Sequence, residues 1–289
     1  YEEVKKEAAA LNIGMAGSEI VGVVPLASIL MAADYYIEKE NLLVIDEDQK
    51  VRLAIERLGL NSVAMFDPNE KIIEYKIAEP PDEPLAGMSL RGFIESVAAR
   101  TSAPGGGSVS AVAAAMGAGL GAMVAKLTYG VRRFEDRDGE MRRIIPVLHG
   151  ITQELIPMID ADTSAFELFM EGLRMQKSTP EQKKAREEKM QSGLKQAAEV
   201  PLKTMRLGDQ VWDAMGDAAQ FGNPASASDI QVGAKMLESG IWGAYKNVLI
   251  NLDGIDDEAF CLELRNEADA IAARAKQKLT YVLKLADRQ

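Results

Sequence analysis

Two aspartates two residues apart, Asp160 and Asp162, are the residues best suited to acid–base chemistry. Positions two apart in a helix point about 200° away from each other, so the pair cannot share a face. Asp162 shares its face with apolar residues: Leu155, Ile159, Phe166 and Phe169. Asp160 shares its face with polar residues: Thr163, Ser164 and Glu167. We therefore expect Asp162 on a buried stripe and Asp160 on the polar side of this helix.

Burial disfavours the charged form of a carboxyl group, so we expect the pKa of Asp162 to be raised. A raised pKa brings a carboxylate towards the range that is useful for a general base. A structural carboxylate that bonds to a neighbouring helix is the alternative. These residues alone leave both interpretations open.

A glycine-rich loop, residues 103–108, precedes a predicted helix. Its glycines let the backbone approach a ligand, and free N–H groups at a helix N-terminus favour an anion. No Gly-Lys-Ser/Thr ends the loop and no strand precedes it, which excludes a Walker A loop and a Rossmann fingerprint. The binding candidates here are Ser102, Gly105, Gly106, Gly107 and Ser108. A flexible turn between helices is the alternative.

Polar and basic side chains supply further candidates for contact with a ligand. Asn247 and Asn251 lie on one stripe of a predicted helix, 228–252, where hydrogen bonds between helices are the alternative. Asp229 lies in the first turn of that helix, where the helix dipole favours an acidic residue in any case. A basic cluster, which is a predicted anion-binding patch or else a solvated surface, contains Lys126, Arg132, Arg133, Arg142 and Arg143.

The composition excludes several classes of function. The 289 residues include 44 Asp and Glu against 33 Lys and Arg, for a formal net charge of −11. A negative field disfavours non-specific binding to nucleic acid or anionic lipid. A single Cys (Cys261) and a single His (His149) exclude an internal disulfide, a thiolate zinc site and a two-His metal site. We therefore expect no metal, and a reducing, cytoplasmic setting.

The elements that must position these residues fall into two segments. Residues 1–79 predict an α/β piece, with strands at 19–24 and 71–77. Residues 80–88, which follow and include closely spaced prolines, predict a stiff linker. Residues 89–289 predict a mainly α domain, a long-helix antiparallel bundle.

Particular positions in the bundle carry their own expectations. We expect kinks at Pro146 and at Pro157 within a long helical stretch, 138–174, a helix start at Thr179, and an interruption at Val200-Pro201. The run Val109–Ala125 contains a Gly-x-x-x-Gly motif, but we interpret it as a buried helix that packs closely on a neighbour, within or between subunits, and not as a membrane span.

The chain resembles a known family. The matching segments of the second domain lie in the family's order: Ser102–Val109, Leu127–Gly130, Asp160–Asp162, Val200–Leu202, Ser228–Val232 and Gly243–Asn251. Together they resemble the cyclodeaminase domain of the formimidoyltransferase-cyclodeaminases, bifunctional folate enzymes of histidine degradation and one-carbon metabolism. The segments 17–25, 38–42 and 72–75 resemble the end of the transferase domain's C-terminal subdomain.

The resemblance implies an ammonia-lyase that converts 5-formimidoyltetrahydrofolate to 5,10-methenyltetrahydrofolate, with no cofactor beyond the folate itself. The family's proton acceptor aligns with Asp162, and the glycine loop and basic residues would hold the folate and its polyglutamate tail. A ring-shaped homo-octamer is also implied. The alternatives are a methenyltetrahydrofolate cyclohydrolase and a non-catalytic helical assembly domain.

The first segment carries a separate expectation. In the family, the transferase's catalytic His and most of its folate site lie upstream of the position that Tyr1 occupies here. We therefore expect the intact protein, but not this chain alone, to transfer the formimidoyl group from formimidoylglutamate to tetrahydrofolate.

Overall fold

The computed structural model describes residues 1–77 and 83–287, which fall into two compact units, Tyr1–Asp82 and Glu83–Gln289. The boundary between the units lies inside the predicted linker, 80–88. The first three residues of that linker lie outside the described residues. Each unit is described by itself.

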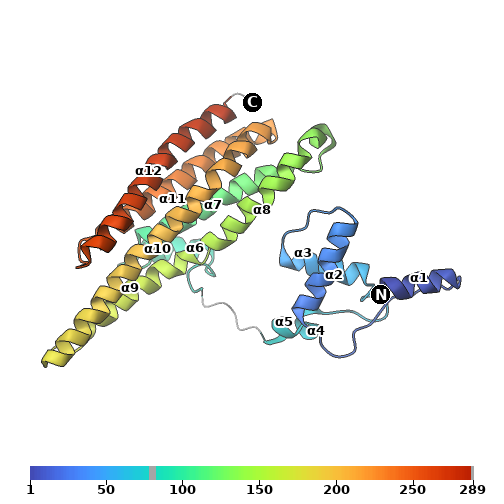
Figure 1. Ribbon diagram of the computed structural model, residues 1–289, viewed down its shortest axis with the longest axis horizontal. Helices are drawn as coiled ribbons and strands as arrows, with labels where there is room; N and C mark the ends of the chain where they lie inside the picture. Colours follow the sequence, from blue (N-terminus) through green and yellow to red (C-terminus); the bar gives the residue numbers. More distant parts are fainter. Residues whose placement is uncertain (78–82, 288–289) are drawn as a thin grey trace. The chain divides into compact units, whose positions relative to one another are not determined.

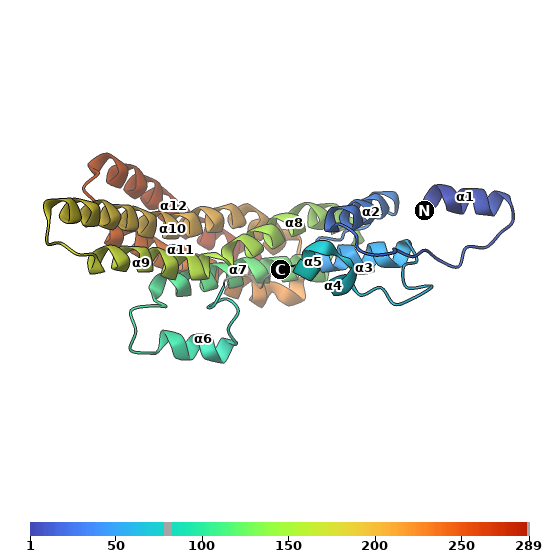
Figure 2. The ribbon, with the colours of Figure 1, turned by 90° about the horizontal axis from the view of Figure 1, so that it is seen from below.

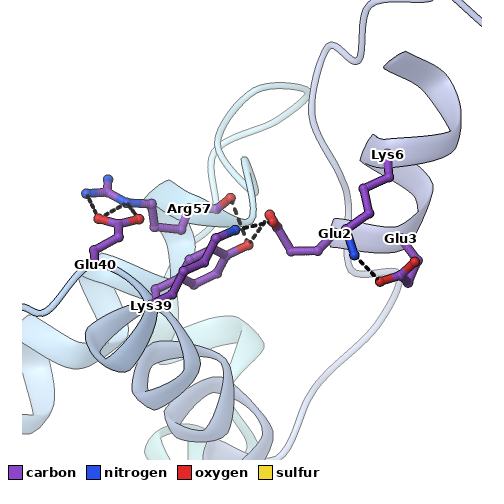
Figure 3. Close-up of polar contacts among 7 residues, drawn as sticks. Glu2, Glu3, Lys6, Lys39, Glu40 and Arg57 are labelled. Carbon is purple, nitrogen blue, oxygen red and sulfur yellow. Dashed lines mark hydrogen bonds and ion pairs between the residues drawn. The ribbon is translucent and has the colours of Figure 1, made fainter. Parts of the chain in front are cut away.

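The first unit is built from helices (Figure 1): α1 (Glu2–Ala10), α2 (Leu26–Lys39), α3 (Glu47–Arg57), α4 (Pro68–Lys71) and α5 (Ile73–Ile77). Apolar faces of α2 and α3 form its core together with Leu60, Phe66 and Ile72. By contrast, α1 buries no residue and is attached through polar contacts, which Figure 3 shows. The Tyr36 hydroxyl donates to Glu2 at 2.9 Å, and Lys39 forms an ion pair with the same carboxylate.

The predicted strands of the first unit are wrong. Within residues 1–77, strand pairing is reduced to one parallel bridge between Val24 and Ile72. Residues 73–77, predicted as part of a strand, form α5. An isolated pair of short strands is marginal in water, and a helix satisfies its backbone groups without a partner. Ile72 is 0% exposed, because its β-branched side chain is buried in the core of this unit and not in a sheet. The described part of this unit is helical and not α/β.

The second unit is a bundle of long helices (Figures 1 and 2), as predicted. Its α-helices are α6 (Leu90–Val97), α7 (Gly106–Thr128), α8 (Asp138–Leu155), α9 (Met158–Arg174), α10 (Pro180–Phe221), α11 (Ala227–Leu252) and α12 (Glu258–Ala286). The predicted start at Thr179 is confirmed, because its hydroxyl accepts from the Gln182 N–H at 3.2 Å in a capping box. Helices α8 and α9 separate at Pro157, whereas Pro146 lies inside α8.

Close packing of α7 on α11 explains the small residues of α7. A Cβ on Gly117 would lie 2.7 Å from the Gly233 carbonyl oxygen, and one on Gly240 would lie 2.6 Å from the Ala114 nitrogen. The two backbones therefore touch where only glycine fits. Among the described residues, α7 is the one helix long and apolar enough to cross a membrane, and 61% of its most apolar window is buried inside the protein. The close packing that the sequence predicted occurs within the chain.

The predicted interruption at Val200-Pro201 is wrong, since α10 runs unbroken from Pro180 to Phe221. Proline lacks the N–H that would bond to the carbonyl four residues earlier. That carbonyl belongs to Ala197, and it accepts instead from the Asn251 side-chain amide of α11 at 2.8 Å. A neighbouring helix thus satisfies the group that Pro201 leaves without its helical donor.

Asn251→Ala is predicted to lower the free energy of unfolding by about 1–3 kcal/mol, because the Ala197 carbonyl loses its partner. Urea denaturation measures the change. Pro201→Ala restores an N–H to α10, so in that background the Asn251→Ala change should cost less. Strictly additive losses in the double variant would contradict this account of the pair.

Candidate active site

The carboxylate of Asp162, on α9, lies against the N-terminus of α7. The Ser108 backbone N–H donates to Asp162 Oδ2 at 3.0 Å, and the Ser108 hydroxyl lies 3.4 Å from the same oxygen. That hydroxyl is also 3.3 Å from the Thr163 hydroxyl. Unpaired N–H groups and the helix dipole make a helix N-terminus attractive to an anion. Here the chain's own carboxylate occupies that position.

Gly107 is required at this contact. A Cβ at Gly107 would overlap the carboxylate of Asp162. The neighbouring Gly106 is exposed, and a Cβ there would lie 3.4 Å from the side-chain nitrogen of Asn247. Gly107 therefore leaves space for the carboxylate of Asp162, and Gly106 lies beside the side-chain amide of Asn247.

Two opposing effects act on the acidity of Asp162. Burial raises the pKa of its carboxyl group above the ordinary value, and the two hydrogen bonds from Ser108 lower it. Burial is the larger effect, so the pKa of Asp162 is raised, in the direction that the sequence predicted. The residue remains half-buried and not fully enclosed. A carboxylate with these properties can exchange a proton with a ligand beside the loop.

Asp160, which the sequence places on the polar side of the helix, is buried in the structure. Asp160 is 7% exposed, and its two oxygens accept from the backbone N–H groups of Leu85 (2.7 Å) and Ala86 (3.0 Å). These donors belong to the turn at residues 83–88, the last six residues of the predicted linker. A helical wheel contains only the residues of one helix, so it could not include a cover from 75 residues away.

The remaining loop and helix candidates divide between the site and the packing. Ser102 is exposed, Gly105 is the N-cap of α7, and Ser108 is 0% exposed and directed at Asp162. The Asn247 amide donates to the Gly243 carbonyl at 2.9 Å beside Gly106, whereas Asn251 bonds to α10. Ser108 thus supports the carboxylate, and the surface for a ligand is left to the exposed part of the loop and Asn247.

The basic candidates lie at the opposite end of α7. At 1.5 Å per residue, Lys126 is about 30 Å along the helix from Gly106, and Arg132 and Arg133 follow it. The Lys126 ammonium lies 3.5 Å from His149 Nδ1. Asp229 is 18 residues before Asn247 on α11, about 27 Å by the same rise. The structure therefore does not bring these four candidates to Asp162 within one copy of the chain.

The sequence patterns did not indicate a role for Thr163, Leu85 or Ala86. Thr163 is next to Asp162 in the chain, which could have suggested it, but no local signal links Asp160 to a turn 75 residues away. Among residues 1–77 and 83–287 no group of three or more His, Cys, Asp or Glu side chains is arranged to hold a metal ion.

Comparison with known proteins gives two family matches and several relatives. The formiminotransferase-cyclodeaminase model matches residues 89–270, and the formiminotransferase domain model matches residues 1–78. The formimidoyltransferase-cyclodeaminase of Dictyostelium discoideum is 50% identical over 287 residues, 99% of this chain and 52% of the relative. The chain thus spans about half the length of the curated relatives that match it.

Two further matches each cover part of the chain. The methenyltetrahydrofolate cyclohydrolase of Methylorubrum extorquens is 33% identical over 187 residues, which cover 65% of this chain and 90% of the relative. The crystal structure of formiminotetrahydrofolate cyclodeaminase from Thermotoga maritima superposes with a TM-score of 0.62 at 31% identity, over 70% of this chain and 96% of that chain.

Asp162→Asn is predicted to stabilise the protein at neutral pH. Because the folded-state pKa of Asp162 is raised, its contribution to stability is full below the unfolded pKa of about 3.9 and is lost as pH rises through the folded pKa. The increase in the free energy of unfolding that the Asn variant shows should therefore grow with pH above about 4 and then level off. Denaturation with urea over a pH series measures it.

Asp160→Asn is the matched control and should change stability in the opposite direction. An amide has one acceptor oxygen for the two N–H donors of Leu85 and Ala86, so we expect a loss of about 1–3 kcal/mol. Equal losses in both variants at every pH would mean that Asp162 has a structural role like that of Asp160.

Gly107→Ala should destabilise the protein by about 1–3 kcal/mol, because the new methyl group displaces the Asp162 carboxylate. At Gly119, in the same helix, the nearest atom to an added Cβ would be 3.8 Å away, so Gly119→Ala should gain about 0.5–1 kcal/mol from helix propensity. Thermal unfolding compares the two variants. A neutral Gly107→Ala variant would disprove the close contact.

Proposed function

The chain belongs to the formiminotransferase-cyclodeaminase family, and we propose that it converts 5-formimidoyltetrahydrofolate to 5,10-methenyltetrahydrofolate and ammonia. The observation that carries the proposal is Asp162, a half-buried carboxylate of raised pKa beside a partly exposed glycine loop. The reaction needs a group that accepts a proton near neutral pH, and with one His and one Cys in the chain that task falls mainly on carboxylates.

The proposed chemistry is a cyclisation followed by loss of ammonia. N10 of the folate attacks the carbon of the protonated formimidoyl group, and Asp162 accepts the proton of N10 as the new C–N bond forms. In the tetrahedral intermediate, the bond between the carbon and its amino nitrogen then breaks. Asp162 returns its proton to that nitrogen, which leaves as ammonia. A carboxyl group with a raised pKa suits both steps, because it is a stronger base when ionised and remains a proton donor when neutral.

Substrate contacts are proposed from position. Ser102 and Gly106 are exposed, and Gly105 and Asn247 beside them are partly buried; we propose that a folate ring lies here, beside Asp162. All the bonds made and broken belong to the folate, so we propose that no added metal or redox cofactor takes part. Activity that survives a chelator and dialysis supports this point.

The basic residues Lys126, Arg132 and Arg133, with Asp229, are about 30 Å from the loop. We propose that the basic side chains contact the distal part of a polyglutamate tail or act on substrate held by another copy. Self-assembly of the chain is supported by apolar side chains that α7 leaves exposed: Val109, Met116, Met123 and Leu127. A cytoplasmic location is proposed from the single unpaired Cys.

Transfer of the formimidoyl group is proposed for the intact protein and not for this chain alone. Residues 1–78 match the formiminotransferase domain, but the single His of the chain, His149, lies in the other unit. An assay of this chain with formimidoylglutamate and tetrahydrofolate tests the point, and measurable transfer would overturn it.

The second candidate function is hydrolysis of methenyltetrahydrofolate. It is favoured by the identity to the Methylorubrum extorquens cyclohydrolase. Separate assays with the two substrates decide between the two activities. A helical assembly domain without catalysis would bind no folate in a calorimetric titration.

Asp162→Asn is predicted to reduce kcat for ammonia release by about 10²- to 10⁴-fold, the range typical of a lost general base. Glu167→Gln changes an exposed carboxylate on the same helix and should leave kcat unchanged. Circular dichroism checks that both variants are folded. Unchanged ammonia release by a folded Asp162→Asn variant at saturating substrate would refute the assignment.

A further inference from the structure

The segment 83–108 is attached to α9 at both of its ends. Near its start, Leu85 and Ala86 donate to Asp160, and at its end Ser108 donates to Asp162. Between these points lies α6, which Ser89 caps at 3.1 Å. Figure 2 shows α6 beside the bundle, joined to it by a loop at each end. The two carboxylates that hold this segment are two residues apart.

The hydrogen bonds to Asp160 and to Asp162 contact α9 on opposite sides. Residues two apart in a helix point about 200° away from each other, so the turn at 83–88 and the N-terminus of α7 lie on opposite faces of the first turns of α9. This part of α9 has no side-chain cap of its own, since its N-cap is Pro157. The Asp160 attachment therefore acts on the same first turns of α9 that carry Asp162.

The Asp162 contact is sensitive to movement of α9. Asp162 approaches Gly107 so closely that a Cβ could not fit, and the Ser108 hydroxyl is already 3.4 Å from its oxygen. A rotation of α9 that carries Asp162 away from α7 would lengthen the distance of 3.0 Å between Ser108 N and Asp162 Oδ2 and weaken this hydrogen bond. By contrast, the bond of 2.7 Å from the Leu85 N–H to Asp160 is buried, and the bond of 3.0 Å from the Ala86 N–H is partly buried.

We propose that Asp160 is a positioning residue for the reaction, which holds Asp162 at the α7 N-terminus through its bonds to the turn at 83–88. This proposal rests on the function proposed above for Asp162. Asp160 itself contacts backbone N–H groups and takes no part in proton transfer. Its effect on the reaction is transmitted through the placement of α9.

The kinetic test compares Asp160→Asn and Leu85→Ala with the unaltered chain. Leu85 is 8% exposed, so its truncation loosens the same turn while both aspartates remain. Misplacement of a reacting group by about 1 Å costs up to 10²-fold in rate, so kcat should fall roughly 10- to 100-fold. KM should change much less, because the exposed loop still packs against α11 through Gly106 and Asn247.

Asp138→Asn is the matched control. Asp138 lies in the first turn of α8 and accepts the Gly130 N–H at 2.9 Å, an exposed bond from a backbone N–H to a carboxylate at the far end of α7. This variant should leave kcat unchanged. A fall in kcat equal to that of Asp160→Asn would mean that general loosening of the bundle, and not the Asp160 attachment, controls the rate.

A readout independent of activity is the amide of Ser108 in NMR spectra. In the unaltered chain its chemical shift should follow the ionisation of Asp162, to which it donates. In Asp160→Asn and Leu85→Ala this pH dependence should shrink, and in Asp138→Asn it should persist. An unchanged Ser108 titration and unchanged kcat in the first two variants would overturn the proposal.

The outcomes separate this proposal from the proposed function. If the unaltered chain releases no ammonia, the function fails, and the Ser108 titration still decides whether Asp160 positions Asp162. If Asp160→Asn does not fold, Leu85→Ala supplies both readouts. If ammonia is released and the turn variants behave like the unaltered chain, the positioning role fails and the function stands.

Discussion

The contact between the Asp162 carboxylate and the first turn of α7 is the interaction on which the site depends. It requires Gly107, because a side chain there would occupy the place of the carboxylate. It also requires α7 to be held firmly, which the glycine contacts with α11 achieve. The glycine loop therefore has a second purpose beyond approach to a ligand. It makes room for a carboxylate of the chain itself at the positive end of a helix.

Asp160 and Asp162 show how differently two neighbouring carboxylates can be used. Asp160 is 7% exposed and both of its oxygens accept backbone N–H groups, so it is part of the fold. Asp162 is half-buried, with a single backbone N–H donor and one long hydroxyl contact. Burial therefore outweighs hydrogen bonding at Asp162 and raises its pKa. Because hydrogen bonds only partly compensate for burial of the charge, this carboxylate remains suited to proton transfer.

Other candidate binding residues also form hydrogen bonds within the chain and so stabilise the fold. Asn251 compensates for Pro201 by donating to the Ala197 carbonyl, and Ser108 is directed at Asp162 with no exposed surface. In each case, a polar side chain that looked available for a ligand satisfies a group that would otherwise be buried without a partner. The basic residues at the far end of α7 raise a different question, because about 30 Å of helix separates them from the loop.

Local patterns in the sequence determined most of the bundle. Helical periodicity, the capping box at Thr179 and the order of the family's motifs need only residues close together in the chain, and they predicted the helices and singled out Asp162. Tertiary structure decided the rest, because it depends on partners distant in sequence. Within residues 1–77, the segments 19–24 and 71–77 pair through one isolated bridge and do not form strands. Asp160 is covered by a turn 75 residues away, and α10 continues through Pro201 because α11 supplies a donor.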